Sequence, residues 1–348
     1  MVEAKPNTRN INLALQGGGA HGAFTWGVLD RLLEEPEIGI EAISGTSAGA
    51  FNAVVIADGI MKDGVEGARR ALRRFWRSVS DAAFASPFRR TPLDRLTGNW
   101  SLDASPAYLM MDLLTRIASP YVLNPLNMNP LIDLLNEQVD FETVRSCDKI
   151  KIYVSATNVE TGRVKVFNRH ELTADMVMAS ACLPQMFQAV EIDGTPYWDG
   201  GYAGNPVLFP FFHKCASSDI VVVQINPVVR QGIPRTAQEI LNRVNEITFN
   251  SSLLKEFRAI DFVDRLIEEG RLNDSRYKEI LLHIISADDE LKPLSASSKL
   301  NAEWDFIEHL FNIGRTTTGQ WIATHADALG KRSTVNARAM FQGDVDPS

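Results

Sequence analysis

The stretch Ile43-Ser44-Gly45-Thr46-Ser47-Ala48-Gly49-Ala50 joins a short apolar segment to the start of a helix rich in small residues. It contains the pattern G-x-S-x-G, and after a strand this pattern predicts a turn so sharp that the neighbours of the serine must be small. Gly45 and Gly49 meet that requirement. Ser47 would then stand at a helix N-terminus, where the helix dipole and unpaired amides favour negative charge. The alternative is that Ser47 only caps the helix, because serine is a preferred N-cap residue.

A second glycine-rich run, Gln16-Gly17-Gly18-Gly19-Ala20-His21-Gly22, follows an expected buried strand and opens an expected helix. Consecutive glycines allow several backbone amides to converge on one anion, such as the oxyanion of acyl transfer. The alternative is a dinucleotide site, because Gly17, Gly19 and Gly22 match G-x-G-x-x-G. The acidic residue that would bind the ribose at the end of the second strand is missing, which disfavours this alternative.

A third run, Tyr197-Trp198-Asp199-Gly200-Gly201-Tyr202, places a carboxylate before two glycines. This is the pattern of an acidic residue on a tight turn that other backbone must approach closely. Taken alone, the run is equally compatible with an Asp-Gly hairpin turn.

Together the three runs resemble the patatin-like phospholipase family, whose pattern is a G-G-G-x-R-G loop, a G-x-S-x-G nucleophile and a D-G-G or D-G-A turn. The run 179–184, Ala-Ser-Ala-Cys-Leu-Pro, adds to a resemblance that covers residues 9–227. The resemblance implies that Ser47 attacks an ester carbonyl and that Asp199 takes its proton. It also implies an oxyanion hole of backbone amides from Gly17, Gly18, Gly19 and Ala48, and chemistry that needs no metal or organic cofactor.

One departure from the family pattern is His21, which stands where the family has arginine. Histidine lacks the five-donor fork of arginine, so this change questions a preference for phospholipids more than it questions ester hydrolysis. It makes a neutral or polymeric ester, such as an intracellular polyester, the closest alternative substrate. It also raises a Ser-His-Asp triad as a second mechanism, for which the order of the chain allows four histidines: His213, His283, His309 and His325.

Expected strands and helices alternate along the chain, which predicts a mainly parallel sheet between helices, the three-layer α/β/α fold that the resemblance also implies. The expected strands are 11–15, 40–43, 150–156, 163–168, 187–192, 220–225 and 279–285. The expected helices are 22–34, 47–58, 173–181 and 206–215, followed by helical stretches 236–269 and 299–329. We interpret 9–330 as one domain with a helical C-terminal region, 236–330, and 331–348 as a flexible tail.

Residues 80–148 interrupt this alternation with prolines among aromatic, leucine and methionine residues, which predicts an inserted cap. Its large side chains could line an acyl channel or pack a helical subdomain; the candidates are Phe84, Phe88, Trp100, Tyr108, Met110, Met111 and Tyr121. Just before the cap, five arginines at positions 69, 70, 73, 74 and 77 form one face of an amphipathic helix. We favour a solvated face over a site for anionic lipid.

The chain has 348 residues, of which 45% are hydrophobic and 22% charged, with a net charge of −8. This composition suits an enzyme with a large core and disfavours nucleic acid as a partner. No apolar run is long enough to cross a bilayer, and the first residues lack a signal-peptide pattern. With three cysteines of no metal-binding spacing, we expect a cytoplasmic protein with reduced thiols, possible contact with a lipid surface and an acyl-ester substrate. The oligomeric state stays open, and a non-catalytic anion-binding module is the alternative from another class.

Overall fold

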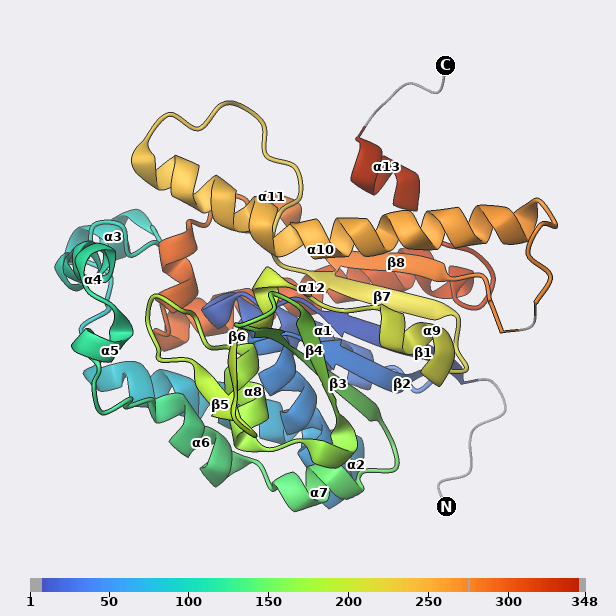
Figure 1. Ribbon diagram of the computed structural model, residues 1–348, viewed down its shortest axis with the longest axis horizontal. Helices are drawn as coiled ribbons and strands as arrows, with labels where there is room; N and C mark the ends of the chain where they lie inside the picture. The colour runs from blue at the N-terminus through green and yellow to red at the C-terminus, as the bar shows by residue number, and fades with distance from the viewer. Residues whose placement is uncertain (1–7, 275, 344–348) are drawn as a thin grey trace.

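The first two strands of the chain lie side by side and parallel, and the rest of the sheet is built outward from them (Figure 1). In this computed structural model, residues 8–274 and 276–343 are described. They form an eight-stranded sheet of order β5-β6-β3-β2-β1-β7-β8, with β4 also paired to β3. The strands are β1 (Arg9–Leu15), β2 (Ile38–Gly45), β3 (Lys151–Asn158), β4 (Val164–Asn168), β5 (Val190–Ile192), β6 (Thr195–Asp199), β7 (Asp219–Gln224) and β8 (Leu281–Ser286).

The central strands β3, β2, β1, β7 and β8 are parallel, whereas β4, β5 and β6 pair antiparallel at one side. Parallel neighbours follow from the helical connections between them. The expected mainly parallel α/β fold is thus confirmed. Strand β6 is the element that the sequence interpretation missed, because the residues around Asp199 read as a turn. It places Asp199 at the end of a strand, opposite Ala156 of β3.

Successive side chains of a strand point to opposite faces, and each face of this sheet is covered by its own set of helices. Leu13 and Leu15 of β1 belong to the larger core, under α1 (Gly22–Leu33), α2 (Ala48–Ala82) and α12 (Trp304–His325). Ala14, between them, belongs to a second core under α9 (Phe209–Lys214), α10 (Ala237–Glu268) and α13 (Ala337–Gln342). The sheet is therefore the middle layer of three.

The second helix is far longer than the expected 47–58 and is broken at Asp63 and Gly64, where the backbone leaves the helical region. Beyond the break, Leu72, Phe75 and Trp76 are buried in the core. Most of the arginines on the opposite face are already paired: Arg69 with Asp30, Glu34 and Glu66, Arg70 with Asp63, and Arg77 with Asp81. The apolar residues of this helix dock on the core, and the arginines lie on the opposite face, as expected for a solvated helix face.

The segment expected to form a cap contains short helices. They are α3 (Pro92–Thr97), α4 (Pro106–Ile117), α5 (Pro120–Leu123), α6 (Pro130–Gln138) and α7 (Phe141–Ser146). Of these, α3, α4 and α5 lie at the left-hand end in Figure 1, whereas α6 and α7 run along the lower side. Proline at the first position of the first four fits its fixed φ and missing amide hydrogen. Of the large side chains proposed for a channel, Trp100 stacks on Phe306, with ring centroids 5.1 Å apart, while Phe84, Met110 and Tyr121 are exposed.

The C-terminal region contains helices on both faces of the sheet. Helix α12 packs on α1, where Gly27 and Gly314 let the two backbones approach: a Cβ at Gly27 would lie 2.0 Å from the Phe311 carbonyl oxygen. The expectation of a flexible tail after residue 330 is wrong for residues 331–343. They include α13, whose residues Met340 and Phe341 pack against the core under α10. Residues 344–348 of the expected tail lie outside the described residues. The remaining helices are α8 (Ala174–Ser180) and α11 (Asp288–Leu291).

Candidate active site

Ser47 lies between β2 and α2, and its backbone has φ 52° and ψ −121°, a region that residues other than glycine rarely adopt. The flanking residues must be glycines, because any side chain there would collide with neighbouring backbone. A Cβ on Gly45 would lie 2.5 Å from the Gly49 carbonyl, and one on Gly49 would lie 2.3 Å from the Leu15 carbonyl oxygen. The predicted strand-turn-helix geometry is present, and it presents Ser47 at the N-terminus of α2.

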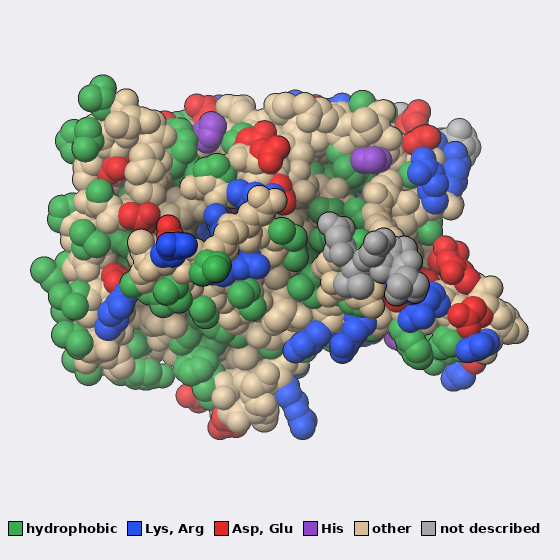
Figure 2. Space-filling model, turned by 90° about the horizontal axis from the view of Figure 1, so that it is seen from above, with side chains coloured by type: hydrophobic (Ala, Val, Ile, Leu, Met, Phe, Trp, Pro, Cys, Tyr) green, Lys and Arg blue, Asp and Glu red, His purple; other side chains and the backbone are tan. Residues whose placement is uncertain are grey.

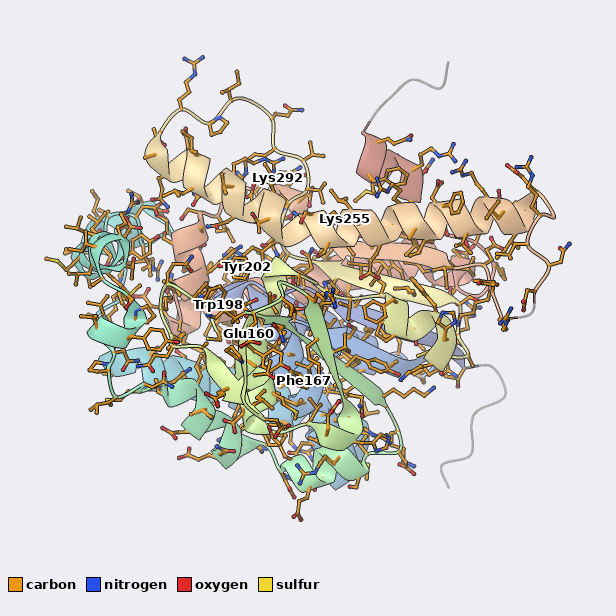
Figure 3. The ribbon with its side chains drawn as sticks, in the orientation of Figure 1. Glu160, Phe167, Trp198, Tyr202, Lys255 and Lys292 are labelled. Atoms are coloured by element: carbon orange, nitrogen blue, oxygen red, sulfur yellow. The ribbon has the colours of Figure 1, made fainter. Side chains whose placement is uncertain are left out.

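The second predicted group, Asp199, ends β6 and is followed by the turn Gly200–Tyr202. The amide of Gly201 donates a hydrogen bond of 2.7 Å to Asp199 Oδ1. Gly200 has no room for a side chain, because a Cβ there would lie 2.2 Å from the Ser155 carbonyl oxygen. Tyr202, labelled below α10 in Figure 3, contacts Phe249 of that helix with ring centroids 5.5 Å apart. The turn is therefore held between β3 and α10.

The carboxyl group of Asp199 lies close enough to the hydroxyl of Ser47 for that hydroxyl to lower its pKa, although the two residues are far apart in sequence. Burial raises the pKa of Asp199 to about 7, against the opposing effects of the Gly201 amide, the Ser47 hydroxyl and the nearby Lys299 ammonium. Asp199 is 1% exposed and Ser47 is 9% exposed. A carboxylate of ordinary pKa is a poor base, so this shift gives Asp199 a basicity suited to accepting a proton near neutral pH.

The glycine-rich run 16–22 lies against the nucleophile, since a Cβ on Gly17 would be 2.8 Å from Ser47 Cβ. The amide of Gly17, however, donates to Asn205 Oδ1 at 2.7 Å, and its carbonyl accepts from Asn226 Nδ2 at 2.8 Å. Gly17 was expected to supply an oxyanion donor. In this structure the donor is occupied by Asn205, so Gly17 serves to hold the loop in place.

The other three amides expected to bind the oxyanion differ from that of Gly17, because no loop or side-chain acceptor was identified for them in the described part of the chain. Within residues 8–274 and 276–343, the amides of Gly18, Gly19 and Ala48 donate none of the loop or side-chain hydrogen bonds identified. Gly19 has φ +57°, and the space beside it is filled by the Lys299 carbonyl oxygen, 2.4 Å from where a Cβ would lie. Gly22 packs on the start of α2, with its would-be Cβ 2.5 Å from Ala48 Cβ. The loop and the nucleophile turn are thus in contact at two points.

His21 is buried, and its Nε2 is 2.8 Å from Ser298 Oγ. Burial, with a smaller contribution from Lys299, lowers the pKa of His21 to about 3, so its ring is neutral. Three of the four candidate histidines for a triad make contacts elsewhere: His283 bonds Asp219 and Thr334, His309 stacks on Trp100, and His325 packs against Trp321. No histidine in the described residues hydrogen-bonds Ser47 or Asp199. The structure therefore gives no support to a Ser-His-Asp triad.

Several polar residues that support the site were not singled out from the sequence as functional. Ser180 accepts the amide of Ser47 at 2.8 Å, and Thr157 donates to the carbonyl of Asp199 at 2.8 Å. Lys299 Nζ donates to Asn226 Oδ1 at 2.7 Å, and burial lowers the pKa of Lys299 to about 8. Ser180 lies in the run 179–184, which was noted for its resemblance alone. The others carry no sequence signal, because they come from distant segments.

Neither a metal cluster nor a membrane span was found in the part of the chain that the structure describes. No group of three or more His, Cys, Asp and Glu side chains there could hold a metal ion. No helix there combines the length and apolar character needed to cross a membrane. The three cysteines, Cys147, Cys182 and Cys215, are unpaired and buried.

The strand-flanked nucleophile turn, the glycine loop and the acid turn are brought together by an α/β fold. Residues 13–212, more than half of the chain, match the family described as Patatin-like phospholipase, and the chain belongs to that family. Membership supports lipid hydrolysis as the class of activity. Strands β7 and β8 and helices α10 to α13 lie outside the matched region.

Two solved structures are similar to this chain at low identity. VipD from Legionella pneumophila is 15% identical with a TM-score of 0.39, covering 92% of this chain and 67% of VipD. Full-length ExoU, solved with SpcU from the type III secretion system of Pseudomonas aeruginosa, is 15% identical with a TM-score of 0.29, covering 88% of this chain and 53% of ExoU. The chain therefore spans only about half the length of ExoU. No curated protein matches this sequence significantly.

Proposed function

We propose that this protein is a serine lipid acyl hydrolase that cleaves carboxylic esters through an acyl-serine intermediate, with Ser47 as nucleophile and Asp199 as base. The observation that carries the proposal is the proximity of a buried carboxyl, whose pKa is raised to about 7, to a serine on a strained turn. A serine that merely capped a helix would need neither the strain nor the carboxyl.

The proposed reaction has two halves. In the first, Ser47 Oγ attacks the ester carbonyl carbon while its proton moves to Asp199, and the protonated Asp199 then donates to the departing alcohol. In the second, Asp199 accepts a proton from water, which attacks the acyl-serine and releases the carboxylic acid. The proton returns to Ser47, so the enzyme is regenerated without any other reactant.

The tetrahedral intermediates carry an oxyanion, and the backbone amides of Gly18, Gly19 and Ala48 are the donors that we assign to it. Each lies on the glycine loop or at the N-terminus of α2, where the helix dipole adds to the stabilisation. Because backbone amides are held by the fold, they need little reorganisation when the charge develops.

Treatment of the native protein with a long-chain fluorophosphonate, followed by peptide mass analysis, tests the proposal directly. We expect one adduct, on Ser47, which the Ser47→Ala variant lacks while retaining its fold. This reagent requires an activated serine but no knowledge of the substrate. An unmodified Ser47, with reagent delivered in detergent or lipid to ensure access, would favour the non-catalytic anion-binding module instead.

A lipid surface is the partner that we propose for the cap. Within residues 106–128, eight large apolar side chains are more than half exposed: Leu109, Met110, Leu113, Ile117, Tyr121, Val122, Leu126 and Met128. Figure 2 shows hydrophobic side chains gathered at this end of the molecule. The charged side chains of α4, Asp112 and Arg116, pair with each other at 2.8 Å. Large exposed apolar faces of this kind suit the boundary between headgroups and acyl chains.

This apolar face is connected to the acid turn by the segment 182–189. Tyr121 Oη accepts the Ala189 amide at 3.3 Å, Gln188 Nε2 donates to the Asn124 carbonyl at 2.8 Å, and the Cys182 carbonyl accepts the Asp199 amide at 2.8 Å. These bonds join the exposed apolar face of the cap to the segment that holds the acid turn. The three unpaired cysteines fit a reducing compartment, and we propose that the protein acts in the cytoplasm at lipid surfaces.

Sedimentation with phosphatidylcholine vesicles tests whether the apolar face of the cap binds a lipid surface. We expect Leu113→Glu/Ile117→Glu to lose most of the binding, because each charge would enter the apolar region. Phe262→Glu, which changes an exposed apolar residue on α10, should leave binding intact and serves as the matched control. Equal binding of all three proteins would contradict a role of the cap.

A neutral or polymeric ester is a second candidate substrate, because the glycine loop carries a neutral His21 in place of a cation. Comparison of kcat/KM for a lysophospholipid and for a monoacylglycerol of the same acyl chain distinguishes the two. A preference for the monoacylglycerol would favour the neutral ester.

A further inference from the structure

The short 3-10 helix η5 (Ala296–Leu300) lies outside the region that matches the family, yet it contacts the glycine loop directly. Its Lys299 carbonyl oxygen fills the space beside Gly19, and its Ser298 hydroxyl meets the ring of His21. These two contacts fall on the first and last residues of the 3-10 helix η1 (Gly19–His21), one of the two turns that carry the proposed oxyanion donors.

The direction of the hydrogen bond between His21 and Ser298 follows from the partners of Ser298. Ser298 Oγ lies 2.6 Å from the Ser295 carbonyl oxygen, which can only accept, so the hydroxyl proton of Ser298 points there. Ser298 Oγ must therefore accept the proton on His21 Nε2. This fixes one tautomer of a neutral ring, and the resulting chain of donors runs from His21 through Ser298 to the backbone of Ser295.

The hydrogen bond between His21 and Ser298 restrains the conformation of the glycine loop. The His21 amide donates to the Gly18 carbonyl at 3.2 Å, which closes a turn and fixes the peptide that carries the Gly19 amide and adjoins the Gly18 amide. The His21 ring is also held edge-on by Phe306 of α12, with centroids 6.0 Å apart. Anchoring the ring at Ser298 therefore restrains the turn. Oxyanion donors lose much of their effect when they are displaced by a fraction of an ångström.

We propose that Ser298 is a positioning residue of the active site, acting through His21 to hold the amides of Gly18 and Gly19 toward the oxyanion. The inference rests on the proposed hydrolase function and extends it to a segment beyond the family match. It also gives His21 a role: the residue that replaces the family arginine anchors the loop through a neutral hydrogen bond instead of a charge.

The test compares Ser298→Ala with Ser298→Thr, which keeps the hydroxyl, and with Ser297→Ala. Ser297 is the matched control, because it is equally buried in η5 but its hydroxyl accepts the amide of Leu102 in the cap, at 2.9 Å. We expect Ser298→Ala to lower kcat about tenfold with KM changed less than about twofold, since an anchor and not a substrate contact is lost. Ser298→Thr should recover most of the rate, and Ser297→Ala should keep kcat.

Inhibition by a long-chain trifluoromethyl ketone reports the oxyanion site itself. Ser47 Oγ adds to the ketone carbon, its proton moves to Asp199, and the ketone oxygen becomes an anion in the oxyanion hole. We expect Ser298→Ala to raise the inhibition constant by about the same factor of ten. In a double-mutant cycle, His21→Asn/Ser298→Ala should lose little more than His21→Asn alone, because Ser298 acts through His21.

An unchanged kcat and inhibition constant in a folded Ser298→Ala variant would overturn the inference, as would an equal loss in Ser297→Ala. Failure of the proposed function is distinguishable from either result. In that case the wild-type protein would form no fluorophosphonate adduct on Ser47 and would hydrolyse no ester, before any variant is compared.

Discussion

The backbone amide of Ser47 donates a hydrogen bond of 2.8 Å to the hydroxyl of Ser180, which is the last residue of α8. The strained turn at the nucleophile is thus fixed by a side chain from another segment, 133 residues further along the chain. Two residues beyond Ser180, the Cys182 carbonyl accepts the amide of Asp199. One short segment, 180–182, therefore supports both members of the proposed dyad.

Replacing Ser180 with alanine removes the acceptor of the Ser47 amide. We expect the variant to lose about 1–3 kcal/mol in the free energy of unfolding, because a buried amide would lack a partner. We also expect kcat to fall about tenfold or more as the nucleophile turn loosens. Urea unfolding and steady-state kinetics measure the two effects. A wild-type kcat in Ser180→Ala would show that the turn holds without this bond.

The activity should depend on pH through Asp199. Since the base must be deprotonated, and burial raises the pKa of Asp199 to about 7, kcat/KM is expected to rise with pH through about 7 and then level off. His21 should not contribute to this limb, because burial lowers its pKa to about 3. A pH profile of kcat/KM on a soluble ester checks this. An acid limb near pH 4 would contradict the assignment.

Asp199→Asn should lower the rate by several orders of magnitude while making the fold more stable at high pH. The raised pKa of Asp199 means that the folded state favours the protonated carboxyl, so its contribution to stability is complete below about 3.8 and is lost as pH rises through about 7. Asparagine stays uncharged. We expect the stability of the variant relative to wild type to increase by about 2–3 kcal/mol between pH 5 and pH 8, since each pH unit below the folded pKa contributes about 1.4 kcal/mol. If the variant and wild type differed in free energy of unfolding by the same amount at pH 5 and pH 8, the result would argue against a buried carboxylate.

The contact between α1 and α12 predicts a strong effect of one methyl group. In Gly314→Ala the new Cβ would lie 2.2 Å from the Phe24 carbonyl oxygen, which must force the helices apart. We expect a loss of about 2–4 kcal/mol in the free energy of unfolding. Gly319→Ala, on the same helix, is the control: its Cβ would meet only Arg31 Nε at 3.9 Å, so alanine should be neutral or stabilising by up to about 1 kcal/mol. Equal unfolding midpoints for both variants would disprove close packing of the helices.

Most of the fold could be predicted from local patterns. Buried strands such as Ile11 to Leu15 are continuous apolar runs, and the helices after them begin at glycine or serine signals. Strand β6 was missed because its last three residues, 197–199, fall in the run that was interpreted as a turn. A five-residue strand shows too little alternation to stand out beside Asp-Gly-Gly. The order of α13 was missed because it depends on packing against α10, a contact that composition does not reveal.

The sequence by itself determined the mainly parallel α/β architecture, the identity of Ser47 and Asp199 as candidates, and the glycines beside them, because these features follow from local sterics and spacing. Only the tertiary structure decided which groups meet. It buried the Asp199 carboxyl near Ser47, which raises the pKa of that carboxyl, paired the Gly17 amide with Asn205, and joined His21 to Ser298. These outcomes depend on burial and on contacts between segments distant in the chain, and no local pattern encodes either.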